Sequence, residues 1–125
     1  MKLGLLYWVL LVLETEDYRG AIADYTQTIQ LVPDDADVYF RRGKAYLFRE
    51  NHQRAIADYT KAIELNPQYT DAYYLRACIR LETEDYQGAI ADYSQTIQID
   101  PDYVEAYRDR GQDIKKTAWW QMRVF

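Results

Sequence analysis

The sequence predicts an all-α protein built as a solenoid of antiparallel helix pairs, and three observations lead to this fold class. The segment LETEDYRGAIADYTQTIQ, residues 13–30, returns as LETEDYQGAIADYSQTIQ, residues 81–98, with sixteen of eighteen residues identical. A weaker copy lies halfway between them, at residues 47–64. The prolines share the resulting spacing of 34 residues: Pro33, Pro67 and Pro101. A fixed period of this length is typical of repeat architectures.

Each repeat is predicted to contain two helices. In the second half of the first repeat, apolar residues from Ala21 to Val32 recur at the spacing of one helix face. A residue that can cap the first turn precedes each second helix: Asp17, Asn51 and Asp85. The proline then ends the helix. The loops are only a few residues long, so neighbouring helices must run antiparallel.

With each proline at position 32 of its unit, residues 1–125 form a single domain of three repeats and a partial fourth. The units cover residues 2–35, 36–69, 70–103 and 104–125.

This pattern resembles the tetratricopeptide repeat (TPR), whose signature is W-x2-L-G-x2-Y, then A-x3-F, then P. The matching residues of the second repeat are Tyr39, Arg42, Gly43, Tyr46, Ala55, Tyr59 and Pro67. Those of the third are Tyr73, Arg76, Ala77, Arg80, Ala89, Tyr93 and Pro101. The resemblance covers residues 2–118 and implies a right-handed TPR superhelix. The first repeat departs from it in its first helix, where Trp8 replaces the arginine and Val9 replaces the small residue.

Small residues recur where two helices of a repeat should approach closely, and a bulky residue there would cost roughly 1–3 kcal/mol. They are Gly43, Ala77 and Gly111 in first helices and Ala21, Ala55 and Ala89 in second helices.

Opposite charges recur near the same joints. The arginines Arg42 and Arg76 are predicted to form ion pairs with Asp58 and Asp92 of the ADY motifs. Because the first repeat has no arginine at this position, Asp24 is expected to find its partner in the next unit. These charges are interpreted as structural.

The resemblance implies that first helices line a concave groove that binds a peptide or another protein. The positions carried over are Asp37, Phe40, Lys44, Leu47, Phe48, Asp71, Tyr74, Cys78, Leu81, Glu82, Glu105, Arg108, Gln112 and Lys115. Phe40 and Tyr74 do not occupy signature packing positions, which makes them the favoured ligand anchors. The alternative is that both rings shield neighbouring helices.

Some family members bind the carboxylate tail of chaperones with a clamp of lysine, asparagine and arginine. The corresponding positions are Leu6, Leu10, Arg41, Asp71 and Leu75, or, one repeat later, Phe40, Lys44, Leu75, Glu105 and Asp109. Most of the cations are replaced by apolar or acidic groups, so we expect no binding of that type.

Composition narrows the function further. A net charge of −5 argues against a nucleic-acid partner. Cys78 is the single cysteine and His52 the single histidine, and neither has partners at ligand spacing. No phosphate-binding glycine loop occurs. We therefore predict a cytoplasmic protein-interaction scaffold, without enzymatic activity, metal or cofactor.

Both ends of the sequence are strongly apolar. Residues 3–13 form an uninterrupted apolar run, shorter than the ~20 residues that span a bilayer. The other end reads TAWWQMRVF. Three explanations stay open, namely self-association to an oligomer, contact with a membrane or partner, and membership of a longer array. Self-association is favoured, through Leu6, Trp8, Leu10, Trp119 and Trp120. A membrane-associated or self-assembling TPR subunit is thus the alternative to the groove scaffold.

Overall fold

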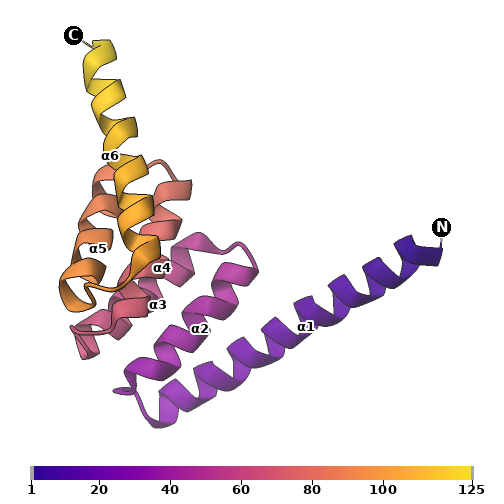
Figure 1. Ribbon diagram of the computed structural model, residues 1–125. Helices are drawn as coiled ribbons and strands as arrows, with labels where there is room; N and C mark the ends of the chain where they lie inside the picture. The colour runs from indigo at the N-terminus through magenta and orange to yellow at the C-terminus, as the bar shows by residue number, and fades with distance from the viewer. Residues whose placement is uncertain (1, 125) are drawn as a thin grey trace. The chain divides into compact units, whose positions relative to one another are not determined.

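The computed structural model describes residues 2–124 of the 125-residue chain, and side chains from residue 17 to residue 115. These residues form six helices and no strand, which confirms the predicted all-α class (Figure 1). The helices are α1 (Lys2–Leu31), α2 (Ala36–Phe48), α3 (His52–Leu65), α4 (Thr70–Glu82), α5 (Tyr86–Ile99) and α6 (Val104–Val124).

The chain divides into two compact units, Met1–Lys61 and Ala62–Phe125. In the first unit, the second half of α1 packs against α2, and α2 contacts the start of α3. In the second unit, α5 packs against both α4 and α6. Each unit therefore consists of helices that pack on their neighbours in sequence, as a helical solenoid requires.

The turns after α2 and α4 have the same construction. Glu50 and Glu84 adopt left-handed backbone conformations, with φ of 58° and 63°. The next amide then donates back into the helix, from Asn51 to the carbonyl of Tyr46 and from Asp85 to the carbonyl of Arg80. A left-handed residue other than glycine costs about 1–2 kcal/mol. The packing of the two helices must offset this cost.

Two of the three predicted caps are present. The side chain of Asp85 accepts a hydrogen bond from the backbone N–H of Gly88, at 3.0 Å, at the start of α5. Asn51 accepts in the same way from the N–H of Arg54, at 3.3 Å, at the start of α3. The third prediction, a cap at Asp17, is wrong, because Asp17 lies inside α1.

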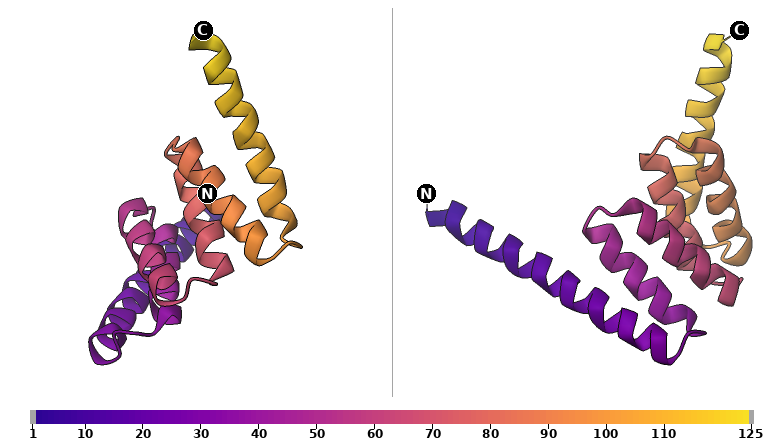
Figure 2. Two further views of the ribbon diagram at one scale, coloured as in Figure 1. Left: turned by 90° about the vertical axis from the view of Figure 1, so that its left-hand side faces the viewer. Right: turned by 180° about the vertical axis from the view of Figure 1, so that it is seen from behind.

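The continuity of α1 is the main departure from the sequence prediction. Residues 14–17 repeat the ETED of residues 82–85, where α4 ends and the chain turns. In α1 the same four residues are helical, and the right-hand view in Figure 2 shows an uninterrupted helix. The first repeat is therefore not a helix pair. The sequence offers a physical reason, since Trp8 and Val9 stand where later repeats have an arginine and a small residue.

The predicted small positions are close contacts in the second and third repeats only. Ala55, Ala77 and Ala89 are fully buried. A Cβ added to Gly43 would lie 2.8 Å from Cε1 of the buried Tyr59 ring, so only glycine fits there. Gly111 is exposed, and a Cβ there would meet nothing within 4 Å. The prediction of a close helix contact at Gly111 is therefore wrong for the residues described.

Candidate partner-binding face

The Arg42–Asp58 ion pair joins α2 to α3. Nη2 of Arg42 lies 2.7 Å from Oδ1 of Asp58, and Nε lies 2.8 Å from Oδ2, so the pair is bidentate. The exposed fractions of the two side chains are 18% and 6%. The hydrogen bond to Asp58 raises the pKa of Arg42 above its ordinary value, despite partial burial of the guanidinium. This pair is a fixed element of the helix packing.

The Arg76–Asp92 pair repeats this geometry between α4 and α5, with two hydrogen bonds of 2.8 Å. Arg80 adds a third, from Nη1 to Oδ2 of Asp92 at 2.9 Å. The Arg76–Asp92 pair was predicted from the sequence, whereas the contact of Arg80 with Asp92 was not. The spacing of four residues between Arg76 and Arg80 could have indicated this contact, because i and i+4 share a helix face.

The third arginine of this series, Arg110 on α6, has a different environment. Its Nη1 lies 3.4 Å from Oγ of Ser94, and its guanidinium carbon lies 5.6 Å from the centre of the Tyr107 ring. The expected pairing of Asp24 with the next unit is also not found. Asp24 is exposed, and Arg42 donates instead to Oγ1 of Thr26, at 3.2 Å.

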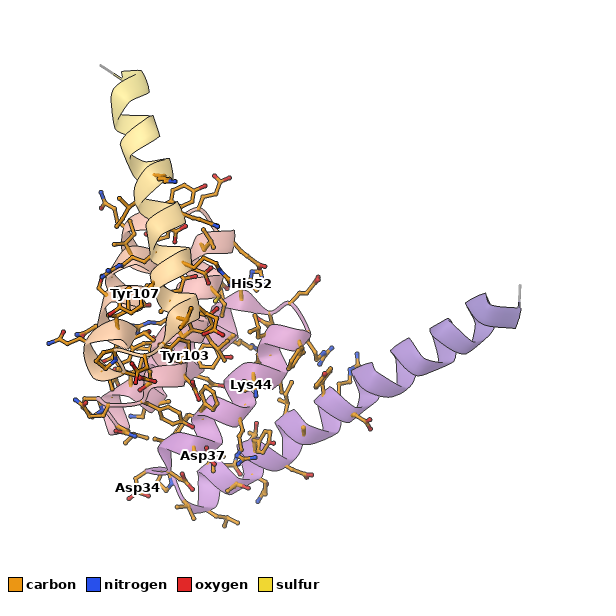
Figure 3. The ribbon with its side chains drawn as sticks, viewed as in Figure 1. Asp34, Asp37, Lys44, His52, Tyr103 and Tyr107 are labelled. Atoms are coloured by element: carbon orange, nitrogen blue, oxygen red, sulfur yellow. The ribbon has the colours of Figure 1, made fainter. Side chains whose placement is uncertain are left out.

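The α2 residues assigned to the groove divide into buried and exposed groups. Asp37 and Lys44 are exposed on α2 (Figure 3). Asp37 holds Arg41 at 2.7 Å. Phe40 is buried, with its ring centre 5.7 Å from that of Tyr59. This position at the joint between α2 and α3 fits the alternative, in which the ring shields neighbouring helices, better than a free ligand anchor. Leu47 is half-buried.

Tyr74, the second proposed anchor, also has partners within its own unit. Its hydroxyl donates to Oδ2 of Asp109 on α6, at 3.0 Å. Its ring centre lies 5.8 Å from that of Tyr93 and 4.9 Å from that of Tyr103. The half-buried ring thus connects α4, α5 and the start of α6, which fits the shielding alternative better than a free anchor.

Cys78 lies beside this aromatic cluster. The hydroxyl of Tyr93 donates to its sulfur at 3.6 Å. Burial raises the pKa of the Cys78 thiol, and hydrogen bonds from tyrosines oppose the rise only in part. Burial likewise raises the pKa of Tyr74, Tyr93 and Tyr103. The cluster therefore favours neutral groups. Leu81, also predicted for the groove, packs on the same core.

The exposed surface of the second unit's first helices is mainly acidic. Asp71 and Glu105 are exposed, and Asp71 accepts a hydrogen bond of 3.3 Å from the hydroxyl of Tyr103. Arg108 and Lys115 are the cations among the exposed predicted residues of this unit, and Nε of Arg108 lies 3.3 Å from Oδ1 of Asp109. Gln112 is exposed. We call the exposed predicted residues of α2, α4 and α6 the first-helix face: Asp37, Lys44, Phe48, Asp71, Glu82, Glu105, Arg108, Gln112 and Lys115.

The residues predicted for self-association lie outside the described side chains. They are Leu6, Trp8, Leu10, Trp119 and Trp120. Within the range that the structure describes, we find no helix with both the length and the apolar character needed to cross a bilayer. Over the same range, no group of three or more His, Cys, Asp or Glu side chains could hold a metal ion.

Helices stacked in sequence, with a packing motif repeated between them, define an α-solenoid repeat protein. Three family models match the chain. A model described as "Tetratricopeptide repeat" matches residues 36–69, and a second with that description matches residues 58–91. A model described as "TPR repeat" matches residues 13–47 and 78–112. Together these matches show that the chain belongs to the tetratricopeptide repeat family.

Solved structures support the same fold. The chain is similar to MamA at 29% sequence identity, with a TM-score of 0.78 and coverage of 81% of this chain. It spans 59% of the MamA chain. It is also similar to the first TPR of Spaghetti (RPAP3), bound to the HSP90 peptide SRMEEVD, at 26% identity and a TM-score of 0.78. In that comparison 82% of each chain is covered.

The Arabidopsis OM64 TPR domain is a further similar structure, at 28% identity and a TM-score of 0.75. The alignment covers 80% of this chain and 83% of that domain. No curated protein matches the chain significantly.

Proposed function

We propose that this protein is an interaction scaffold whose first-helix face binds an extended or helical segment of a partner protein. The observation that supports the proposal is a difference between the packing positions and the exposed positions of each first helix. Positions that pack against the second helix repeat from unit to unit, whereas other exposed positions differ, apart from the carboxylate shared by Asp37, Asp71 and Glu105. Fold alone does not define a binding function, so the argument rests on these side chains.

The buried positions are nearly constant. Tyr39 and Tyr73 correspond to each other, and each is 8% exposed. The exposed and half-buried positions vary in chemistry. Lys44 of the second repeat corresponds to Cys78 of the third and to Gln112 of the partial fourth. When side chains at equivalent positions differ in chemistry along a regular scaffold, each repeat can recognise a different residue of one ligand segment.

The charge of the second unit indicates the kind of ligand. Asp71, Glu82, Glu105 and Asp109 place carboxylates on or beside its first-helix face, against the two cations Arg108 and Lys115. Opposite charges across an interface steer association and exclude like-charged partners. We therefore propose a segment with a basic side chain at this unit.

An acidic tail is a poorer ligand for these carboxylates. The peptide bound by the RPAP3 domain, SRMEEVD, ends in acidic residues. Binding of such a peptide here would require it to approach Asp71 and Glu105, so the proposed ligand differs in charge. Catalysis forms no part of the proposal.

The test is selection from a displayed peptide library, followed by fluorescence anisotropy on purified peptides. We expect recovered peptides to be enriched in lysine or arginine. Glu105→Lys should weaken their binding roughly fivefold, since an exposed charge contributes up to about 1 kcal/mol. Glu64→Lys, the same change on second helix α3, is the matched control and should leave binding unchanged. Equal loss in both variants, or selection of acidic peptides, would contradict the proposed site.

A further inference from the structure

Helix α6 presents the packing face of a first helix, and this face is exposed. Tyr107 corresponds to the buried Tyr39 and Tyr73, yet it is 44% exposed. Val104 and Ile114, on the same side of the helix, are 71% and 49% exposed. The space beside Gly111 is open, whereas Gly43 is closed by Tyr59. The side of α6 that carries these residues is therefore ready to receive a second helix.

The second half of α1 presents the opposite surface. Residues 21–25 read AIADY, as do the second helices α3 and α5. In α3 and α5 the first alanine and the tyrosine of this motif are fully buried, and the aspartate is almost fully buried. In α1, Ala21 and Tyr25 are only half-buried, and Asp24 is exposed. This side of α1 therefore lacks the first helix that covers its counterparts.

The two faces are complementary in charge and in shape. Arg110 of α6 has the sequence position of Arg42 and Arg76, whose partners are the aspartates of AIADY motifs. Asp24 is the aspartate of the AIADY motif in the first repeat, which has Trp8 in place of the arginine at this position. Gly111 offers the same open position that receives the Tyr59 ring at Gly43. The α6 face thus has a cation and an open position, and the α1 face has the carboxylate and the tyrosine that occupy the equivalent places in later repeats.

We propose that α6 of one copy of this chain packs antiparallel on residues 17–31 of α1 in a second copy, head to tail. The contact completes a TPR helix pair from two chains, with an Arg110–Asp24 ion pair equivalent to Arg42–Asp58. Because the two faces differ, each bound copy still presents one free face, and the contact continues into a ring or an open filament.

The lengths of the two helices fit this arrangement. With Gly111 opposite Tyr25, in the register of Gly43 and Tyr59, residue 124 stands opposite residue 12. Residues 116–124 of α6 then run alongside residues 12–20 of α1, so the long helices α1 and α6 overlap. The α6 extension is rich in apolar residues, with Trp119, Trp120 and Met122, whereas residues 12–20 of α1 read VLETEDYRG and are mainly polar.

The first half of α1 is a poor substitute for α6. It would have to turn back at residues 14–17, where α1 is helical. At the two decisive positions it has Trp8, which supplies no cation, and Val9, which is larger than the residue that the joint admits at Gly43. The α6 of another copy has Arg110 and Gly111 at these positions.

The test is sedimentation velocity of the 125-residue chain from micromolar to submillimolar concentration. We expect wild type to associate with increasing concentration. Arg110→Glu alone and Asp24→Arg alone should each weaken association about tenfold or more, because each brings like charges together. An equal mixture of the two variants should regain association, since each cation then meets a carboxylate. Arg49→Glu and Asp34→Arg are the matched controls, with the same charge changes at exposed residues outside the two faces.

Each result of the sedimentation experiment either supports or overturns the contact between α6 and α1. Loss in both single variants with recovery in the mixture supports the contact, provided circular dichroism shows unchanged helix content. If a variant loses helix content, the double variant carrying both changes provides the same test, and it should associate as wild type does. A monomeric wild type at all concentrations overturns the proposal. So does association that the single variants leave unchanged, or that neither the mixture nor the double variant restores.

Discussion

Residues 13–30 and 81–98 are nearly the same sequence in two different structures. In the later copy the chain turns at Glu84, which has φ of 63°, and α5 begins at Tyr86. In the earlier copy the corresponding residues continue as helix within α1. Since sixteen of eighteen residues agree, the shared segment cannot by itself decide whether the chain turns. The residues that precede the segment must contribute the difference.

The preceding helix supplies that difference through its contacts. In the third repeat, Arg76 and Arg80 both bind Asp92, and Ala77 is fully buried. These contacts offset the cost of the left-handed Glu84. The first repeat has Trp8, Val9 and Val12 at the same three positions. A straight α1 avoids both a left-handed residue and the burial of Asp24 without a cation.

The largest expected effect on the free energy of unfolding comes from replacing Asp92, and the equivalent change at Asp24 serves as the comparison. Asp92→Ala should lower the free energy of unfolding by about 3 kcal/mol, because it leaves two arginines without their shared carboxylate. Asp24→Ala should change it by less than about 0.5 kcal/mol, because Asp24 is exposed. Urea unfolding at low protein concentration measures both. Equal effects would remove the energetic distinction between the two repeats.

A second comparison uses two glycines of first helices. Gly43→Ala should be destabilising, since the added Cβ lies 2.8 Å from the buried ring of Tyr59. Gly111→Ala should stabilise by up to about 1 kcal/mol, because alanine favours a helix and nothing lies within 4 Å. We expect the two variants to differ by about 2 kcal/mol in thermal or urea unfolding. A stabilising Gly43→Ala would contradict the close packing of α2 on α3.

The aromatic cluster of the second unit makes a prediction about alkaline pH. The pKa values of Tyr74, Tyr93 and Tyr103 are raised by burial, so the folded protein holds these protons more tightly than the unfolded chain. Their contribution to stability is complete below the ordinary tyrosine pKa of about 10 and decreases as pH rises above it. Tyr103→Phe should reduce the decrease, measured by urea unfolding between pH 8 and about 11. If Tyr103→Phe left the pH dependence of the unfolding free energy unchanged, the raised pKa of Tyr103 would be contradicted.

The smallest expected effect concerns Cys78. Because burial raises the pKa of its thiol, little thiolate is present at neutral pH. Alkylation by iodoacetamide should therefore be slower in the folded protein than in urea, and it should accelerate only above the pH at which free cysteine reacts. The time course can be followed by mass spectrometry. Equal rates in the folded and unfolded chain would show that Cys78 is not shielded by Tyr74 and Tyr93.

Much of the fold could be predicted from the sequence because the repeat places equivalent residues in equivalent contacts. The period fixed the helix pairs from α2 onward, and charge complementarity between Arg42 and Asp58 indicated their ion pair. The absence of a turn at residues 14–17, which are helical in α1, could not be predicted in this way. Local sequence is the same in both copies, and the outcome depends on long-range contacts that a local pattern does not contain.

The candidate site was predicted less well. Register placed Asp37 and Lys44 on the exposed side of α2, where the structure has them. The same reasoning chose Phe40 and Tyr74 because they lie outside the TPR signature, yet both rings pack on tyrosines of neighbouring elements. A signature identifies residues that must be buried in many proteins. It does not identify the additional rings that one particular protein buries.

The account depends most on the claim that α1 is straight because its first half lacks the arginine and the small residue. Spin labels at Leu3→Cys and Gln30→Cys, in a Cys78→Ser background, measure this directly by pulsed electron paramagnetic resonance. A continuous helix predicts a separation of about 40 Å, and adding Trp8→Arg with Val9→Gly should shift the population to about 10–15 Å, the spacing of packed helices plus labels. A short distance in the chain without those two changes would contradict the account.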